Sequence, residues 1–582
     1  MIEDMKKINI YNKVLTLALA TLALTACTDS FLDKDPDDRT EIDSPDKVIE
    51  LFAASYPDAN YGWVCELSSD NVMDLNSQHL PASAAAKQEL THYNLPSSGR
   101  QDDEMFRFEP VKSSTSSDTP AAIWTSFYGS INAANEGLAA LDRLEKEGYV
   151  PDNKFKAARA EGLLIRAYDH FILVNCFSQA YKNDELSKKD IGVPYITEPI
   201  TIVDGHYDRS NVTDTYKKIQ ADLEEGLKNI SDVNYEKPKW HFNTAAAHAF
   251  AARFYLFSHN WAKVVEHADL VLGTSNEVLL NRMFDYSALD DLYYLSDFAN
   301  VWQSPYIYSN IMLMDTYSTI QRKCTSRYGQ GSLVARAVFY HRSPMWENSG
   351  SYWPVNITML VAGFGGNGYG SYYPAWISEQ FEYSDKVAGI GYAHTIRREF
   401  TYAELLLERA EAKIMLGDLE GAEEDLITFR AGMVKFSPKT KDNYTGFMNP
   451  LTHEMIMGWF AKKTNSNYNC FDDWNFVSNM SPDYVIPAEA VPYMNALNYF
   501  RRYETNFTGM RFFDLKRWGM EYSHEYGLDN VVYYMKWDDP RRALEVPEDA
   551  IASGLEPSRP QTVDSIKSET TLPPSHFSVF ND

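Results

Sequence analysis

The chain has 582 residues, and its 81 acidic and 54 basic side chains give a net charge of −27. A field of that sign repels phosphate backbones, so we expect no nucleic-acid partner. Aromatic residues make up 14% of the chain. Rings in that number must form either core or binding surface.

The N-terminus reads as an export signal. Basic residues precede an apolar run from Val14 to Ala26, which is about half the length needed to span a bilayer. The run ends in Leu-Thr-Ala-Cys, the pattern of a bacterial lipobox, which predicts lipidation at Cys27. We therefore expect residues 1–26 to be a lipoprotein signal peptide and residues 27–45 a tether. The alternative is an ordinary buried cysteine behind a signal peptide.

Paired helices are predicted next along the chain. Apolar residues recur at three- and four-residue steps in 121–144 and 153–177, and again after Thr213, Asn243 and Asn260. After a long interval, residues 398–430 show the same periodicity, interrupted by Gly417 and Asp418 as a helix end and a new N-cap.

Helix hairpins of this kind stack into tetratricopeptide-like arrays. The sequence therefore predicts an all-α fold within one domain, residues 46–582, with hairpins at about 121–275 and 398–519.

Two segments, at about 60–110 and 283–386, lose this periodicity and are rich in Tyr, Trp, Gly, Ser and Asn. Long loop-rich insertions in a compact domain are usually functional. Flat rings flanked by amide and hydroxyl side chains can stack on a sugar ring and bond its hydroxyls, so we expect an oligosaccharide site here. The candidate ligand contacts are Trp302, Trp346, Trp353, Trp376, Tyr352 and Tyr372. If these rings are core instead, the site is expected near Trp63 and Tyr93.

Catalytic and metal-binding motifs are not found. Gly363, Gly365 and Gly368 match G-x-G-x-x-G, but the residues that follow do not favour the helix that a dinucleotide site requires. His453-Glu454 lacks the second histidine of a zinc protease, and no C-x-x-C pair occurs. We predict no enzyme activity, no cofactor and no metal. Acidic pairs such as Asp102-Asp103 leave a glycan-active enzyme as the less favoured alternative.

Four segments resemble the SusD/RagB family of nutrient-binding lipoproteins. These are the lipobox followed by SFLDKDP, the helix at 158–177, the hairpin at 402–430, and GMRFFDLKRWG at 509–519, which is almost the signature "G.R.fDLkRwG". The family's usual terminal NPGY is missing, and Thr428-Phe429 stands where an Asn usually precedes Arg430.

The resemblance implies a partner and a location. The partner is a TonB-dependent, SusC-like β-barrel, and the location is the outer-membrane surface, where the protein is held by a lipid anchor. It also implies an oligosaccharide ligand, with a peptide as the alternative. In the 509–519 motif, we expect Arg511, Asp514 and Arg517 to pair locally while the apolar residues lock the segment onto the helices.

Overall fold

The computed structural model describes residues 42–77, 95–111, 116–200, 207–289, 294–331, 360–365, 369–433, 451–460, 480–527 and 531–559, with four isolated positions between them. Cys27, Tyr93, Trp346, Tyr352 and Trp353 lie outside these residues. Among the described residues, no helix is long and apolar enough to cross a membrane.

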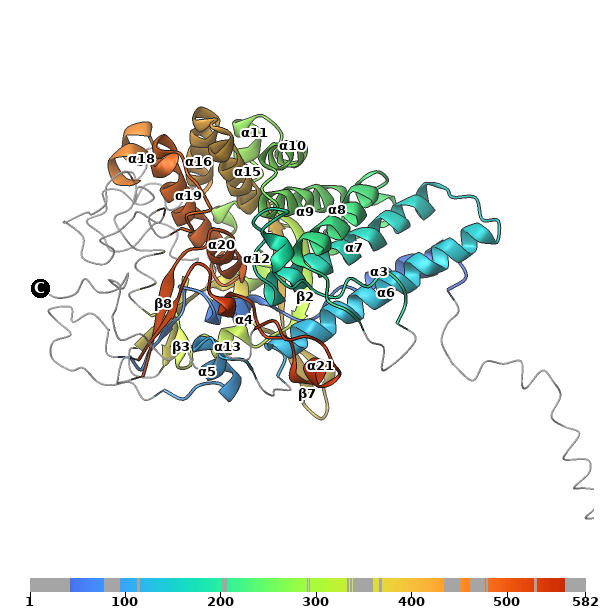
Figure 1. Cartoon of the computed structure of the whole chain (residues 1–582), viewed down its shortest axis with the longest axis horizontal. Helices are drawn as coiled ribbons and strands as arrows, with labels where there is room; N and C mark the ends of the chain where they lie inside the picture. The colour runs from blue at the N-terminus through green and yellow to red at the C-terminus, as the bar shows by residue number, and fades with distance from the viewer. Residues whose placement is uncertain are drawn as a thin grey trace, which may run out of the picture. The chain divides into compact units, whose positions relative to one another are not determined.

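Antiparallel helix pairs form the main body of residues 44–559 (Figure 1). Helix α6 packs on α7, α7 on α8, α9 on α10, α10 on α15, and α15 on both α16 and α19. The bounds of these helices are α6 Pro120–Lys146, α7 Asn153–Phe177, α8 Val212–Leu227, α9 Thr244–Phe257, α10 Trp261–Leu272, α15 Tyr402–Leu416, α16 Leu419–Met433 and α19 Val491–Glu504. The predicted tetratricopeptide-like helical fold is confirmed.

Local signals set the ends of these helices. Asp152 accepts a hydrogen bond from the Phe155 amide (2.8 Å) at the start of α7, and Asn243 caps α9 in the same way. Helix α15 ends at Gly417, whose φ of 81° is the left-handed conformation expected there. These interactions span three or four residues, which is why the sequence predicted the boundaries closely.

Helix α20 (Met510–Arg517) contains most of the 509–519 motif and is buried. Arg517 pairs with Glu411 on α15 and with Asp514 (2.8 Å), and Asp514 also accepts from Arg501 on α19. The expected inward packing of Phe512, Phe513, Leu515 and Trp518 is confirmed. Arg511, however, pairs with Asp70 (2.7 Å) and not within the motif. A local pairing was wrong here because a carboxylate 441 residues away in sequence faces the guanidinium.

The segment expected to be irregular contains regular strands. Antiparallel strands β2 (Asn310–Tyr317), β7 (Ile390–Thr401) and β6 (Gln380–Asp385) form a three-stranded sheet in that order. Gly363 and Gly365 lie in β4 (Leu360–Gly365), which pairs with β5 (Tyr369–Pro374), so a strand follows them where a dinucleotide site would need a helix.

The shorter elements complete the description. They are α3 Pro45–Ala53, α4 Gly62–Leu67, α5 Arg100–Phe106, α11 Asn276–Leu280, α12 Leu295–Trp302, α13 Ile320–Lys323, α18 His453–Phe460, α21 Glu548–Ala552, β1 Met73–Asp74, β3 Tyr328–Gly329, β8 Tyr522–Tyr526 and β9 Val531–Met535.

Candidate ligand-binding face

Trp302 and Trp376 are buried, with 2% and 4% of their surface exposed. Their rings meet edge to face at 5.4 Å, and Trp302 also stacks on Phe284. The Arg398 guanidinium lies over both indoles, at 4.9 and 4.6 Å from the ring centroids. Neither indole therefore presents a face on which a sugar could stack in this structure.

The other expected contacts lie in different surroundings. Tyr372 is half-buried on β5, where its amide donates to the Gln330 carbonyl (2.9 Å). Trp63, from the alternative location, is fully buried, and its indole donates to Asp102 (2.9 Å). For Trp346, Trp353 and Tyr352 the prediction stays a prediction.

Some exposed aromatic side chains of this region, Tyr317 among them, lie on the three-stranded sheet. Directly opposite residues in an antiparallel sheet share a face. Tyr317 on β2 is opposite His394 on β7, and Glu382 on β6 is opposite Tyr392 on β7. We call this surface, formed by Asp315, Tyr317, Glu382, Tyr392 and His394, the tyrosine face.

The tyrosine face combines rings with hydrogen-bonding groups. Tyr317 is 40% exposed and meets Tyr392 edge to face at 4.7 Å. His394 Nδ1 lies 2.6 Å from Asp315 Oδ1. A hydrogen bond to Glu382 raises the pKa of Tyr392 to about 12, so its hydroxyl stays protonated at neutral pH. The face thus offers two flat rings beside two carboxylates.

The opposite face of the sheet holds it rigidly against the protein. Arg397 donates to Asn60 Oδ1 (2.7 Å) and stacks its guanidinium over the Tyr61 ring at 3.7 Å. Thr316 donates to the Thr395 carbonyl across the two strands. Strand β7 then continues directly into α15, whose N-cap is Thr401. The tyrosine face is therefore fixed to the helical array by its own chain.

The buried tryptophans contact this sheet through residues of β6 and β7. Gln380 on β6 donates to Gln303 Oε1 (2.7 Å), and Gln303 in turn donates to the carbonyls of Trp376 and Ser378. Arg398, which covers both indoles, belongs to β7. Trp302 and Trp376 are therefore packed against Arg398 of the sheet. Of the tyrosine face, Asp315, Tyr317 and Glu382 fall within 283–386, while Tyr392 and His394 lie beyond it.

Sequence reasoning missed Tyr317, Tyr392 and His394. The signal that could have identified Tyr392 and His394 is the alternation of β7, where buried Thr395, Arg397 and Glu399 interleave with more exposed neighbours. For Tyr317 it is the end of β2, where buried Thr316 lies between exposed Asp315 and Tyr317. The high glycine and aromatic content of 283–386 favoured a loop interpretation there, and the following residues 390–401, which form β7, were not predicted as a strand.

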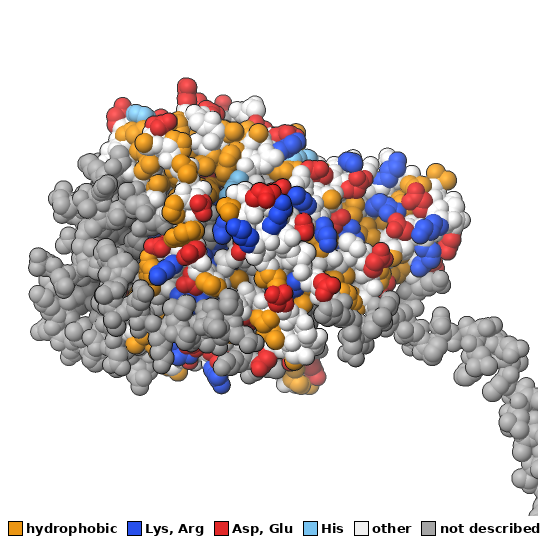
Figure 2. All heavy atoms as spheres, in the orientation of Figure 1, with side chains coloured by type: hydrophobic (Ala, Val, Ile, Leu, Met, Phe, Trp, Pro, Cys, Tyr) orange, Lys and Arg blue, Asp and Glu red, His pale blue; other side chains and the backbone are white. Residues whose placement is uncertain are grey.

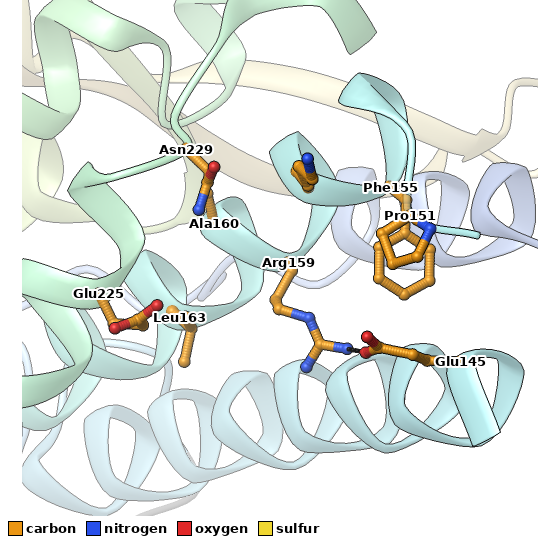
Figure 3. A pocket seen from close by; sticks show the side chains of 9 residues that line it. Glu145, Pro151, Phe155, Arg159, Ala160, Leu163, Glu225 and Asn229 are labelled. Atoms are coloured by element: carbon orange, nitrogen blue, oxygen red, sulfur yellow. Dashed lines mark hydrogen bonds and ion pairs between the residues drawn. The ribbon is translucent and has the colours of Figure 1, made fainter. Parts of the chain in front are cut away.

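A separate hollow of about 200 Å³ lies between the α6–α7 turn and the end of α8 (Figure 3). Phe155, Ala160 and Leu163 form apolar parts of its wall. Arg159 already pairs there with Glu145 (3.2 Å) and Asp142. On the face that Figure 2 shows, acidic and basic side chains are interspersed over these helices. The hollow contains no side chain of the sheet, and we assign no role to it.

The fold and the tyrosine face define a helix-hairpin scaffold that carries an exposed aromatic surface. Residues 30–256 match a SusD-like family described as starch-binding and associating with the outer membrane, and residues 326–550 match the SusD family. The chain belongs to the SusD/RagB family.

Solved structures of this superfamily share the fold at low sequence identity. A SusD superfamily protein from Bacteroides thetaiotaomicron is 14% identical, with a TM-score of 0.57 over 90% of this chain and 100% of that one. One from Bacteroides vulgatus is 16% identical, with a TM-score of 0.57 over 89% and 99%. A SusD-like carbohydrate binding protein from Bacteroides vulgatus is 14% identical, with a TM-score of 0.53 over 91% and 100%. No curated protein matches the chain.

Proposed function

We propose that this protein is a non-catalytic, lipid-anchored glycan-binding protein of the cell surface. It captures an oligosaccharide and delivers it to a TonB-dependent, SusC-like barrel in the outer membrane. Family membership supports the ligand class and the location. The observation that carries the binding proposal is the tyrosine face, where the exposed Tyr317 ring and the half-buried Tyr392 ring lie beside carboxylates on a rigid sheet.

The chemistry of this surface suits a sugar. The C–H face of a pyranose packs on an aromatic ring, while carboxylate oxygens accept hydrogen bonds from its hydroxyls. Asp315 and Tyr317 project from the outer strand β2, Glu382 projects from the other outer strand β6, and Tyr392 projects from the central strand β7. We propose Tyr317 and Tyr392 as stacking residues. Trp346, Trp353, Tyr352 and Tyr372 stay proposed contacts, and Trp302 and Trp376 are proposed to act by supporting the sheet.

Two alternatives need a direct test. A peptide ligand would also use exposed rings and carboxylates. A glycoside hydrolase would use two carboxylates on either side of the bond it cleaves. Asp315 is opposite Ile396 and Glu382 is opposite Tyr392, so the two positions differ by two strand spacings and four residues along β7, roughly 16 Å in all. Both groups are instead engaged, with His394 and Tyr392, on an open surface.

The experiment is affinity electrophoresis of the full chain against a panel of polysaccharides, with analysis of the products. Retardation without released sugars supports capture, and released sugars indicate an enzyme. If no polysaccharide retards the protein, the glycan proposal fails and a peptide panel follows.

Variants locate the site. Tyr317→Ala and Tyr392→Ala should each weaken binding roughly three- to tenfold, as expected for losing about 0.5–1.5 kcal/mol of ring contact. Tyr306→Ala is the matched control, because Tyr306 is 93% exposed outside the sheet. Equal affinity in all three variants would place the site elsewhere on the protein.

A further inference from the structure

A second exposed aromatic pair lies at the end of the sheet away from the tyrosine face. Tyr308 is 59% exposed and lies two residues before β2. Tyr402 is the first residue of α15, directly after β7, and its amide donates to the Ser309 carbonyl (3.1 Å). The Tyr308 and Tyr402 rings stack, with their centroids 5.9 Å apart and an angle of 17° between their planes.

The length of β2 separates this pair from the tyrosine face. Tyr308 precedes the strand and Tyr317 ends it. Since a strand rises about 3.3 Å per residue, the backbones of these two residues are roughly 25–30 Å apart. One sugar residue therefore cannot contact both surfaces.

Two cations accompany the tyrosine pair, one beside each ring. The Lys239 ammonium lies 6.0 Å from the centroid of the Tyr308 ring, and the Arg282 guanidinium carbon lies 5.7 Å from the centroid of the Tyr402 ring. Lys239 belongs to the 3-10 helix Pro238–Trp240, and Arg282 follows α11. We call Lys239, Arg282, Tyr308 and Tyr402 the cationic cluster.

Neither cation forms an ion pair with a carboxylate in the part of the chain that the structure describes. Lys239 Nζ donates to the Ile307 carbonyl (2.6 Å), and Arg282 Nη1 donates to the Val271 carbonyl (2.7 Å). Burial lowers the pKa of Lys239, and an anion placed beside the ammonium would offset that effect. Two positive charges bonded only to neutral groups therefore meet on a chain whose net charge is −27.

We propose that the cationic cluster is a second binding site, for a sugar residue that carries an anionic group, either a uronate carboxylate or a sulfate ester. The C–H face of the sugar packs on the exposed Tyr308 ring, while its anionic group accepts hydrogen bonds from Lys239 and Arg282. This site goes beyond the tyrosine face and does not depend on the ligand bound there.

Charge distinguishes the two surfaces. Asp315 and Glu382 of the tyrosine face would repel the anionic group that Lys239 and Arg282 attract. The net negative charge of the chain does not prevent binding at the cationic cluster, because salt at physiological concentration screens exposed charges more than about 8 Å away. The two surfaces are therefore expected to bind sugars of different charge.

The experiment compares polysaccharides that share a backbone and differ in charge. Affinity electrophoresis of the full chain against polygalacturonate and its methyl ester tests recognition of a carboxylate, and dextran sulfate with dextran tests recognition of a sulfate. We expect the charged member of at least one pair to retard the protein more strongly than its neutral counterpart. Equal retardation within both pairs, or none by any polymer, would overturn the proposal.

Variants assign the binding to the cationic cluster. Lys239→Ala and Tyr308→Ala should each weaken binding of the charged polymer roughly fivefold or more. Lys237→Ala is the matched control, because it removes the same charge from an exposed lysine two residues away and should bind as wild type does. Equal losses in Lys237→Ala and Lys239→Ala would indicate non-specific attraction and overturn the site. Unchanged binding in both Lys239→Ala and Tyr308→Ala would do the same.

The polymer pairs themselves use the wild-type chain, so their result does not depend on a variant folding. They also separate this proposal from that for the tyrosine face. A protein that binds neutral glycans but distinguishes neither charged pair would overturn the second site and leave the proposed function intact. A protein that binds only charged polymers, through Lys239 and Tyr308, would support the second site and contradict the role of the tyrosine face.

Discussion

At the scale of single residues, burial decides what a tryptophan does. The Trp376 indole donates to the Asn506 carbonyl (3.1 Å), and its ring is enclosed by Trp302 and Arg398. Tyr317, only a few residues beyond the buried part of its strand, keeps an exposed ring. Composition alone cannot distinguish these two environments.

This contrast gives a stability prediction. Trp302→Ala and Trp376→Ala should each lower the free energy of unfolding by about 3–5 kcal/mol, because each empties a fully packed site. Chemical denaturation measures the loss, and Tyr306→Ala should stay within about 0.5 kcal/mol of wild type. A small change in the free energy of unfolding of both variants, together with a loss of glycan affinity, would indicate that Trp302 and Trp376 contact the ligand.

His170 provides a prediction about acid stability. Its Nδ1 lies 2.8 Å from the Arg166 carbonyl and donates to it, so Nε2 is left to accept from the Ile196 amide (3.1 Å). Burial lowers the pKa of His170 to about 3. The neutral ring is thus the folded form, and a proton on Nε2 would remove the acceptor.

The sign follows from the unfolded pKa of about 6.5. The contribution of His170 is complete above that pH. Below it the unfolded chain takes up a proton that the folded chain refuses, so stability falls by about 1.4 kcal/mol per pH unit until about pH 3. Urea unfolding of wild type and His170→Gln between pH 4 and 7 tests this. The variant should show the shallower dependence, and parallel curves would contradict the assignment.

At the scale of elements, a buried ionic network joins α20 to α15 and α19. Arg517 and Arg501 share Asp514, and Glu411 also accepts from the Trp518 indole (2.8 Å). Salt bridges to Arg501 and Arg517 lower the pKa of Asp514 despite its burial. The 509–519 motif therefore joins α20 to α15 and α19 through buried ion pairs.

Removing one charged side chain from this network should lower the free energy of unfolding, because its oppositely charged partners stay buried. Arg517→Ala leaves Glu411 and Asp514 buried with less compensation, and we expect a loss of about 3–5 kcal/mol. Lys188→Ala breaks an exposed pair with Glu185 (2.7 Å) and should cost less than about 1 kcal/mol. Denaturant unfolding measures the free energy of unfolding of both variants. Similar decreases in the two would argue against a stabilising buried ionic network.

At the scale of the whole molecule, membership of the SusD/RagB family associates the helical fold with the outer membrane. The two family matches extend from residue 30 to residue 550, with an interval between 256 and 326. Cys27 lies three residues before the first match and outside the described residues. We propose that this cysteine carries the lipid anchor and that the protein faces outward from the cell.

Cys27→Ala tests the anchor. The variant should be released or remain unprocessed, because the lipid is expected to supply most of the membrane affinity. Labelling of whole cells with a membrane-impermeant reagent, followed by fractionation, measures both location and exposure. Unchanged surface labelling in the membrane fraction of the variant would contradict lipidation at this residue.

The sequence by itself determined the helical hairpins, because their signals are local. Apolar periodicity, the cap Asn243 and the left-handed Gly417 act within three or four residues, and each was predicted from the sequence. The same locality explains the prediction of an inward-facing α20.

Only the tertiary structure determined how the strands of the sheet pair and which of the nearby aromatic side chains are buried. Strand β2 pairs with β7 across the intervening chain, and Asn310 lies opposite Thr401. Arg511 likewise forms an ion pair with the distant Asp70. Trp376 is buried partly by Asn506, 130 residues away. Such contacts depend on where distant segments come together, which no window of sequence specifies. For that reason the sequence predicted an aromatic-rich region at 283–386 but not the tyrosine face, whose Tyr392 and His394 lie beyond that region.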